Sequence, residues 1–401
     1  MNNKKTKVLS LLLAVLMLTG VFSGLMITSS AVSDDENADN PYGLLDNVEG
    51  GIILHCWCWS FNTIKENMET IAKSGYSAIQ TSPINAVYEG DGGGLKINGD
   101  DADGKWYYHY QPVAYTIGNY QLGTEEEFKA MCETAHSYGV KVIVDVVANH
   151  TSPSKSAVSY DLRNIKGGLY HDYNGAADPD SRKSMTQWYQ GLPDVNTQNE
   201  NYQKLILDYL KNCVADGADG FRYDTAKHIE LPDDDPEFAS EFWPTVLDNG
   251  SSFQYGEVLQ GTNSKETESS RFPDYADIMH VTASSYGAFL RTFLSKYDTS
   301  AKGLGNYYSE KVSDDRLVTW VESHDTYANG GASGSSATSF WLTNSEIRKG
   351  WAIVAARGTT SLFFSRPDGS SPDNVFGNNL IGPAGDDNYF NEEVVAINHF
   401  H

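Results

Sequence analysis

Positive charge is scarce in this sequence. It contains 29 Lys and Arg against 53 Asp and Glu, which gives a formal net charge of −24 at pH 7. A surface this acidic lacks the basic footprint that nucleic-acid phosphates need, and anionic membranes and polysaccharides would repel it. We therefore expect no nucleic-acid partner, whereas a neutral polymer is compatible with the charge.

Cysteine is also rare, with only four residues in 401. Four cysteines do not make a disulfide scaffold at this chain length. Cys56 and Cys58 lie two apart in a strand-like run, where a bridge between them would be strained. The spacing is not Cys-x-x-Cys and no His or Cys cluster stands nearby, which argues against zinc. We expect buried, unpaired thiols that behave as small apolar residues.

The N-terminal segment has the pattern of a secretory signal. Three lysines precede an apolar run from Val8 to Ile27, and small residues follow around Ala31. We predict a signal peptide over residues 1–31 and a secreted, extracellular protein that has no membrane contact after cleavage. The length of the apolar run also leaves a membrane anchor open. The acidic stretch that follows predicts a flexible leader over residues 32–48.

Strand-like runs alternate with helical runs through the rest of the chain. Strands are expected at Gly51–Cys56, Ser77–Gln80, Val140–Val147, Gly220–Tyr223, Phe253–Tyr255, Ile278–Thr282, Leu317–Val321 and Ser361–Phe364. Helices are expected at Asn62–Ser74, from Thr124 onward, and at Tyr202–Cys213, Glu237–Leu247, Ser285–Tyr297, Glu346–Ala356 and Glu392–His401. This alternation predicts the α/β class, with eight units that can close a (β/α)8 TIM barrel. An open doubly wound sheet is the alternative, although no Gly-x-Gly-x-x-Gly or Walker loop follows any strand.

One connection is too long to be a turn. Residues 151–200 follow the third of these strands and are rich in Gly, Asn, Asp and Ser. A loop of this length in a compact domain is usually functional. We predict an inserted domain over 151–200, within a catalytic barrel formed by residues 49–150 and 201–401.

Ionisable residues gather at the predicted strand ends, where barrels of this kind place their catalytic groups. These ends carry three acids, two histidines and an arginine: Asp224, Glu257, Asp325, His150, His324 and Arg222. Each acid alone could be a helix cap or a loop carboxylate. Three acids delivered to one face by three separate strands are hard to explain in that way.

The spacing of these groups suggests their chemistry. Arg222 and Asp224 lie two apart on a strand and project to the same side. The guanidinium favours the ionised carboxylate, which suits a nucleophile. Glu257 is then expected to have the raised pKa and to protonate the leaving oxygen, and such a pair about 5 Å apart makes a retaining glycosidase. Asp325 would bind sugar hydroxyls more tightly as the ring flattens.

Five short motifs occur in order along the chain: DVVANH (145–150), LPDVN (192–196), GFRYDTAKH (220–228), YGEV (255–258) and VESHD (321–325). Together they resemble the signature regions of α-amylases in glycoside hydrolase family 13, especially those of secreted bacillus-type bacterial enzymes. The likeness extends from Gly51 to His401. It implies a (β/α)8 barrel whose insertion is a domain B, and an endo-acting enzyme that hydrolyses α-1,4-glucosidic bonds of starch and maltooligosaccharides.

The resemblance also implies a role for each matching residue. Asp224 matches the nucleophile, Glu257 the acid/base and Asp325 the transition-state stabiliser of a double displacement. The implied substrate contacts are stacking by Tyr110, hydrogen bonds from Gln111, His150, Arg222 and His324, and leaving-group contacts from Lys227 and His228. Without the resemblance, Tyr110 would be interpreted as a core aromatic residue.

A structural calcium ion between the barrel and domain B is a further implication of the resemblance. Asn149 and Asp194 match its side-chain ligands, and the backbone carbonyls of Met185 and His228 match two more. Oxygen atoms from separate loops are the ligands that calcium takes. Turn chemistry would explain Asn149 and Asp194 equally well if the motifs were absent.

Two matters stay open. Members of the family usually continue past the last barrel helix into an antiparallel β domain, and we expect that domain to be absent from this chain, which ends at His401. The function could also be a related family 13 specificity, such as a transglycosylase, a cyclodextrin-processing enzyme or a debranching enzyme. A non-catalytic starch-binding protein is disfavoured because all three acids are present. We expect a monomer whose partners are starch and maltooligosaccharides.

Overall fold

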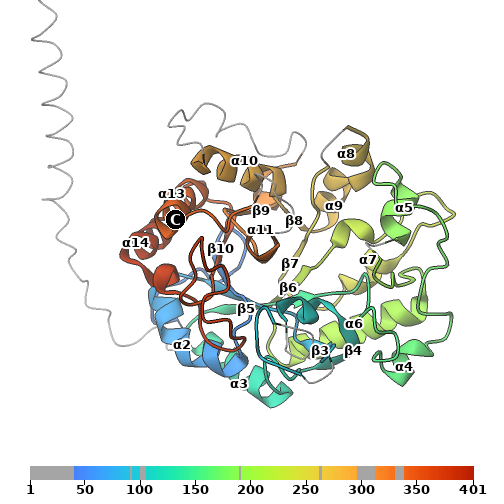
Figure 1. The fold of residues 1–401 in the computed structure, drawn as a ribbon, viewed down its shortest axis with the longest axis horizontal. Helices are drawn as coiled ribbons and strands as arrows, with labels where there is room; N and C mark the ends of the chain where they lie inside the picture. Colours follow the sequence, from blue (N-terminus) through green and yellow to red (C-terminus); the bar gives the residue numbers. More distant parts are fainter. Residues whose placement is uncertain are drawn as a thin grey trace, which may run out of the picture. The chain divides into compact units, whose positions relative to one another are not determined.

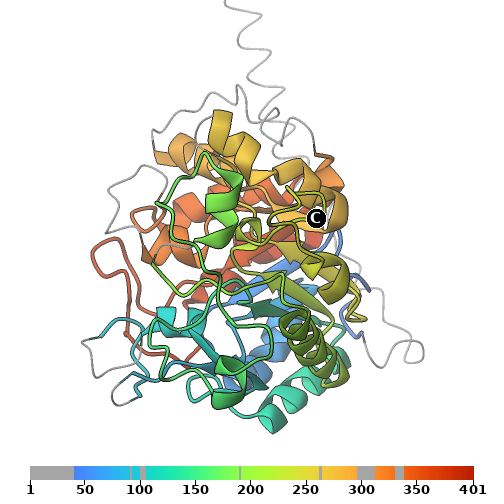
Figure 2. The ribbon, with the colours of Figure 1, turned by 90° about the vertical axis from the view of Figure 1, so that its right-hand side faces the viewer.

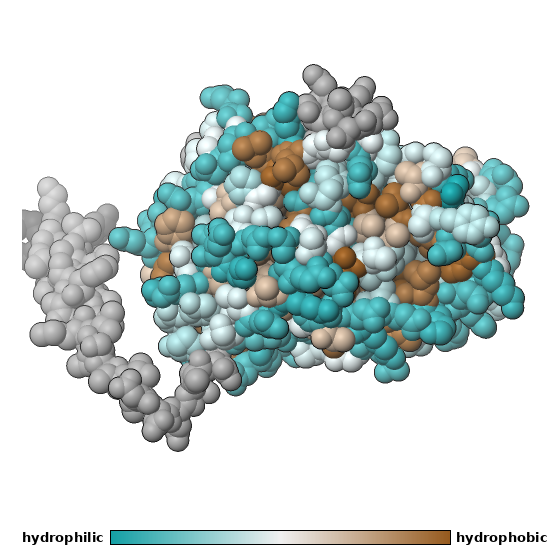
Figure 3. Space-filling model, turned by 90° about the horizontal axis from the view of Figure 1, so that it is seen from below, coloured by the Kyte–Doolittle hydropathy of each residue, from teal (hydrophilic) through white to brown (hydrophobic). Residues whose placement is uncertain are grey.

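The computed structural model describes residues 40–90, 93–99, 105–188, 191–261, 264–295, 312–329 and 338–401. The predicted signal peptide and the leader up to residue 39 lie outside this part. Within it, no helix combines the length and the apolar character that a membrane span requires. The face seen in Figure 3 is largely hydrophilic, and its apolar residues form small separate groups.

Eight parallel strands form a closed barrel in the order β1-β10-β9-β8-β7-β6-β5-β2 (Figure 1). The strands are β1 (Ile52–Cys56), β2 (Ala78–Thr81), β5 (Lys141–Val146), β6 (Gly220–Tyr223), β7 (Phe253–Gly256), β8 (His280–Thr282), β9 (Leu317–Trp320) and β10 (Thr360–Phe364). All eight predicted strands are present, with ends that differ by one or two residues. The predicted (β/α)8 barrel is therefore confirmed, and an open sheet is excluded.

Alternate residues of each strand face the barrel interior and the surrounding helices. In β1, Ile53 packs inside the barrel with residues such as Ile143 and Val318, whereas Leu54 packs outside against the helices. Both faces of these strands are buried, which explains why β5 reads as a nearly continuous β-branched run. The four cysteines are buried and unpaired, as expected.

Helices on the outside of the barrel follow the predicted pattern with one correction. They include α2 (Phe61–Lys73), α3 (Glu125–Ser137), α6 (Glu200–Ala215), α7 (Phe242–Val246), α10 (Ser284–Ser295), α13 (Asn344–Ala355) and α14 (Glu392–Phe400). Thr124 caps α3 through the expected capping box with Glu127. The helix predicted from Glu237 begins only at Phe242. Before it, Asp234 and Asp235 accept hydrogen bonds from nearby backbone N–H groups and hold the chain in turns.

Several elements in the connections were not predicted. An antiparallel hairpin of β3 (Asn85–Val87) and β4 (Pro112–Ile117) follows β2, and α8 (Ser264–Ser270) and α9 (Phe272–Ile278) lie between β7 and β8. The predicted domain B contains α4 (Tyr160–Arg163) and α5 (Arg182–Gln187). In Figure 2 this segment runs in green from α4, low in the view, to α5, high in the view.

The end of the predicted flexible leader packs on the barrel unit. The ring of Tyr42 stacks on Tyr138, with 6.2 Å between ring centroids, and Val48 is buried. The side chain of Asn40 accepts a hydrogen bond from the backbone N–H of Leu44 and donates one to its carbonyl. Residues 40–48 therefore belong structurally to the barrel unit.

Candidate active site

The carboxyl ends of β5, β6, β7 and β9 bring the predicted catalytic residues together. Asp224 follows β6, Glu257 follows β7, and Asp325 lies in the first turn of α11 (His324–Ala328), just after β9. Two adjoining cavities, of about 510 and 260 Å³, meet at this point. Glu257 and Asp325 line both cavities, which join there into one cleft, and Asp224 lines the smaller cavity.

Arg222 holds three carboxylates at the floor of the cleft. Its Nη1 atom donates to both oxygens of Asp145, at 2.7 and 2.8 Å, and to Asp224 at 3.1 Å. Its Nη2 atom lies 3.1 Å from Glu257. Asp145, for which no role was predicted, stands in β5 and also accepts a hydrogen bond from the hydroxyl of Tyr110 at 2.9 Å. Asp145 therefore orients both Arg222 and Tyr110.

Negative charge at this floor exceeds what one guanidinium neutralises. Burial and the charge of Glu257 raise the pKa of Asp224 well above its usual range, although Arg222 opposes that change. The prediction that Arg222 keeps Asp224 ionised is therefore wrong. Burial and the neighbouring carboxylates favour the protonated form of Asp224 more strongly than one guanidinium favours its ionised form.

Asp325 lies at the more open edge of the same cluster. Burial first, and then the charge of Glu257, raises the pKa of Asp325 to about 7. Its side chain keeps 41 % of its surface exposed to the cleft, so water there moderates this shift. Asn329 donates a hydrogen bond to it at 2.9 Å, and Nε2 of His324 lies 3.5 Å away.

The smaller cavity is lined by aromatic and amide side chains. The ring of Tyr110 lies parallel to that of His324, with 4.9 Å between centroids, and the backbone carbonyl of Tyr110 accepts a hydrogen bond from Nε2 of His150 at 3.0 Å. Burial lowers the pKa of His150 to about 4, so this imidazole is neutral at pH 7. The side-chain oxygen of Gln111 is buried and accepts no hydrogen bond from the described residues. All four of these predicted substrate-binding residues line this cavity together with Trp106 and Tyr107.

The larger cavity contains the predicted leaving-group residues, Lys227 and His228, on the 3-10 helix η2 (Ala226–His228). The backbone at Thr225 turns into η2 with φ of 49°, and its N–H donates to Glu257 at 3.0 Å. Gly256 lets β7 approach η2 closely, because a Cβ atom there would lie 2.8 Å from Cβ of Ala226. Burial lowers the pKa of Lys227, and nearby Glu266 partly offsets this.

The four predicted calcium ligands form two contacting pairs. The amide of Asn149 donates to Asp194 at 3.1 Å, and Nδ1 of His228 donates to the carbonyl of Met185 at 2.7 Å. Among the described residues, no group of three or more His, Cys, Asp and Glu side chains could hold a metal ion. The predicted calcium site has only one such side chain, the carboxylate of Asp194; its other ligands are one amide and two backbone carbonyls. His171, which was not predicted, lies 2.8 Å from the carboxylate of Asp194.

Comparisons with known proteins agree with this geometry. A family model described as the α-amylase catalytic domain matches residues 60–288. An α-amylase of Butyrivibrio fibrisolvens is 43 % identical over 92 % of this chain and 40 % of its own length. An α-amylase of Clostridium acetobutylicum is 35 % identical over 91 % of this chain and 45 % of its own length. The chain thus spans less than half the length of these two curated relatives.

A solved structure of α-amylase I from Eisenia fetida has the same fold, with a TM-score of 0.68 and 18 % identity over 87 % of this chain and 77 % of that one. An Anoxybacillus α-amylase gives a TM-score of 0.66 with 18 % identity, covering 88 % of this chain and 79 % of that one. The family model covers more than half of the present chain. The barrel, the carboxylate cluster and these matches lead to one conclusion: the chain belongs to the α-amylase family of glycoside hydrolases.

Proposed function

We propose that the protein is an endo-acting α-amylase that hydrolyses α-1,4-glucosidic bonds of starch and maltooligosaccharides with retention of configuration. The observation that carries the proposal is the position of Asp224 and Glu257. Both contact Arg222; Glu257 lines both cavities, and Asp224 lines the smaller one. A glucan that passes through both cavities would have its scissile bond between these two carboxyls. Because the cleft continues on both sides of this point, an internal bond can reach it.

In the proposed reaction, a carboxylate oxygen of Asp224 attacks the anomeric carbon while the glycosidic C–O bond breaks. Glu257 gives its proton to the departing oxygen, which leaves as the hydroxyl of the shortened glucan. A water molecule then attacks the anomeric carbon of the glycosyl-enzyme, Glu257 takes the proton of that water, and Asp224 is released. The two inversions give net retention.

The surroundings of the acids support this division of roles. Arg222 offers donors to both carboxylates and can stabilise Asp224 as a leaving carboxylate in the second step. Asp325 lies at the open edge of the cluster, where it can accept hydrogen bonds from sugar hydroxyls that become more acidic as the ring flattens. The neutral side chains of the smaller cavity suit an uncharged sugar.

Two measurements test this function. Proton NMR of the first products from a maltooligosaccharide should show the α anomer before mutarotation, whereas β anomer appearing first would rule out the double displacement. Chromatography of products from soluble starch should show a range of oligosaccharides early in the reaction. A single small product released from chain ends would contradict endo action, and cyclic or lengthened products would favour a related family specificity.

We also propose that calcium is bound by Asn149, Asp194 and the carbonyls of Met185 and His228. The side-chain oxygen of Asn149 is buried without a hydrogen-bond donor among the described residues. Burial raises the pKa of Asp194 well above its usual range, which marks a carboxylate that a cation would stabilise. An ion there would supply structural cross-linking of domain B to the barrel. Metal-stripped protein should then melt at a lower temperature, and added calcium should raise the free energy of unfolding by roughly RT ln(1 + [L]/Kd), and Tm with it. Identical melting temperatures with and without calcium would contradict the proposed calcium site.

Finally, we propose that the protein is secreted after removal of residues 1–31 and acts as a monomer. The order of lysines, apolar run and small residues supports this proposal. Mass spectrometry of the protein from culture medium should give an N-terminus near Val32. Recovery of the uncleaved chain in the membrane fraction would instead favour an anchor.

A further inference from the structure

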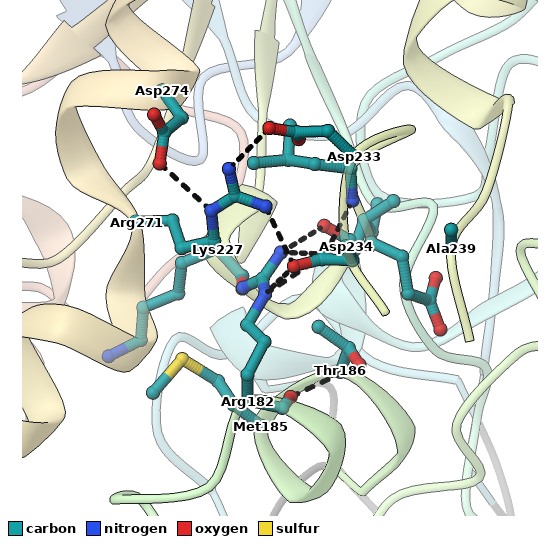
Figure 4. Close-up of polar contacts among 12 residues, drawn as sticks. Arg182, Met185, Thr186, Lys227, Asp233, Asp234, Ala239, Arg271 and Asp274 are labelled. Carbon is teal, nitrogen blue, oxygen red and sulfur yellow. Dashed lines mark hydrogen bonds and ion pairs between the residues drawn. The ribbon is translucent and has the colours of Figure 1, made fainter. Parts of the chain in front are cut away.

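Arg182, the first residue of α5, makes an unusual number of contacts for a residue outside the catalytic floor. Its Nε and Nη2 atoms bind the carboxylate of Asp234 at 2.9 to 3.1 Å. Nη2 also donates to the hydroxyl of Tyr275 at 2.8 Å, and Nη1 donates to the backbone carbonyl of Lys227 at 2.8 Å. Figure 4 shows this guanidinium between α5, the segment of Lys227 and the loop of Asp234. Its side chain is only 13 % exposed.

These contacts join three segments that are far apart in the sequence. The Lys227 carbonyl belongs to η2, Asp234 to the turns after it, and Tyr275 to α9. Arg182 also reaches the carbonyls of Ile229 and Ser269, at 3.3 and 3.4 Å. One planar side chain therefore fixes the position of α5 relative to η2 and to the pair α8–α9.

Helix α5 and two of the elements that Arg182 contacts, η2 and α8, form part of the wall of the larger cavity. Helix α5 contributes Ser184 and Met185, η2 contributes Lys227 and His228, and α8 contributes Glu266. No disulfide joins these segments, because the four cysteines are free. The separation between α5 and η2 thus depends on polar contacts: one joins His228 to the Met185 carbonyl, and Arg182 makes most of the others between α5 and its neighbours.

From this arrangement we infer that Arg182 is a positioning residue for the leaving-group half of the cleft. It sets the distance between α5 and η2, and through it the placement of sugar units beyond the scissile bond. It lines neither cavity and does not contact the three catalytic acids in the structure. The inference rests on the proposed function, since it concerns the glucan-binding side of the same cleft.

Arg271 provides a natural control, because it binds the same carboxylate without contacting the cavity wall. Its Nη1 atom lies 2.9 Å from Asp234, and its other partners are Asp233 and Asp274 (Figure 4). Those two aspartates are 72 and 47 % exposed. Loss of Arg271 should weaken the ion-pair cluster but leave α5 attached to η2.

The test compares Arg182→Lys with Arg271→Lys on two substrates. Maltoheptaose extends into the leaving-group half, whereas maltotriosyl fluoride places only a fluoride ion there. A lysine keeps the charge but cannot reach Asp234, Tyr275 and the Lys227 carbonyl together. We expect Arg182→Lys to lower kcat/KM for maltoheptaose by about ten- to a hundredfold and to shift its cleavage position, with the fluoride affected less than about twofold. Arg271→Lys should leave both substrates near the wild-type values.

Each other outcome has a defined meaning. Equal losses on both substrates, or equal effects of the two lysine variants, would make Arg182 a purely structural residue and overturn the inference. If Arg182→Lys does not fold, Tyr275→Phe removes one partner of the guanidinium and should shift cleavage in the same direction by a smaller factor. An unchanged cleavage pattern in folded Tyr275→Phe would then overturn the inference. A wild-type protein that cleaves neither substrate would reject the proposed function itself.

Discussion

Two arginines, the buried Arg222 and the largely buried Arg182, organise the two sides of this cleft in opposite ways. Arg222 binds three carboxylates, whereas Arg182 binds one carboxylate, one hydroxyl and backbone carbonyls. Around Arg222, burial and like charge raise the pKa of Asp224. Around Arg182, burial would raise the pKa of Asp234, but the hydrogen bond and charge of Arg182 outweigh it and the pKa falls.

The surroundings of Asp224 and those of Asp234 thus have opposite effects on the stability of the fold. The floor around Arg222 holds more negative charge than one cation can neutralise, so the ionised form of Asp224 is unfavourable for stability at neutral pH. Asp234 instead contacts two guanidinium groups, those of Arg182 and Arg271, so its ionised form stabilises the fold. Four predictions test this contrast, beginning with the largest effect.

Asp224→Asn should abolish glucan hydrolysis, because no other group is placed to form the glycosyl-enzyme. We expect a loss of about 10⁴-fold or more in kcat, by analogy with removal of a nucleophile elsewhere. The measurement is reducing-sugar release from soluble starch by protein whose circular dichroism matches the wild type. Retention of more than a few per cent of the activity would exclude Asp224 as the nucleophile.

Glu257→Gln should lower activity on starch by about 10² to 10⁴-fold, the range for loss of general acid–base catalysis. The loss should be much smaller in the first step with a glycosyl fluoride, whose leaving group needs little protonation. Pre-steady-state release of fluoride measures that step directly. An equal loss with good and poor leaving groups would contradict the assigned role.

Asp234→Asn should destabilise the protein by about 3 kcal/mol at pH 7, because it leaves Arg182 buried without its carboxylate. Asp274→Asn is the matched control and should cost about 1 kcal/mol or less, since that carboxylate is 47 % exposed. The lowered pKa of Asp234 makes its contribution present above pH about 4 and lost as pH falls below that value. Urea unfolding at pH 7 and pH 3 should therefore show the difference between Asp234→Asn and wild type shrinking in acid.

The effect of Asp224→Asn on the free energy of unfolding should be smaller than that of Asp234→Asn and opposite in sign: the variant should be more stable than the wild type. A raised pKa means that the folded state binds more protons than the unfolded state, so the carboxylate costs stability as pH rises above about 4. The variant should gain about 1 kcal/mol, or roughly 2 °C in Tm, at pH 8 and much less at pH 5. Calcium is kept saturating in both proteins. A gain that is independent of pH would show that charge crowding at the floor is not its cause.

Much of the fold was readable from the sequence because the barrel strands are buried on both faces. All eight strands were predicted, since runs such as Val140–Val147 are apolar almost throughout. The short helices α5 and α8 were missed because helices of six or seven residues that are stabilised by tertiary contacts carry little periodic signal. The helix expected from Glu237 was too long because its acidic turns have helix-like composition.

The site was predictable to a similar extent. The three acids and their neighbours stand at strand ends or in short motifs, and they meet in the structure as expected. The raised pKa of Asp224 could not be predicted from the pair of Arg222 and Asp224 alone, because it depends on burial and on charges from other strands. Arg182 could not be found from the sequence, since its partners lie 45 to 93 positions away.

The closure of the barrel sets a constraint on how the chain is made. Ile52 of β1 pairs with Ser361 of β10, and the two are 361 minus 52, or 309, positions apart. At about 5 to 20 residues per second, a ribosome needs roughly 15 to 60 s to synthesise the residues between them. For that time one edge of β1 has no native partner, and an open strand edge can pair with other chains. Successful production of this protein therefore depends on keeping β1 from pairing elsewhere until Phe364 has emerged.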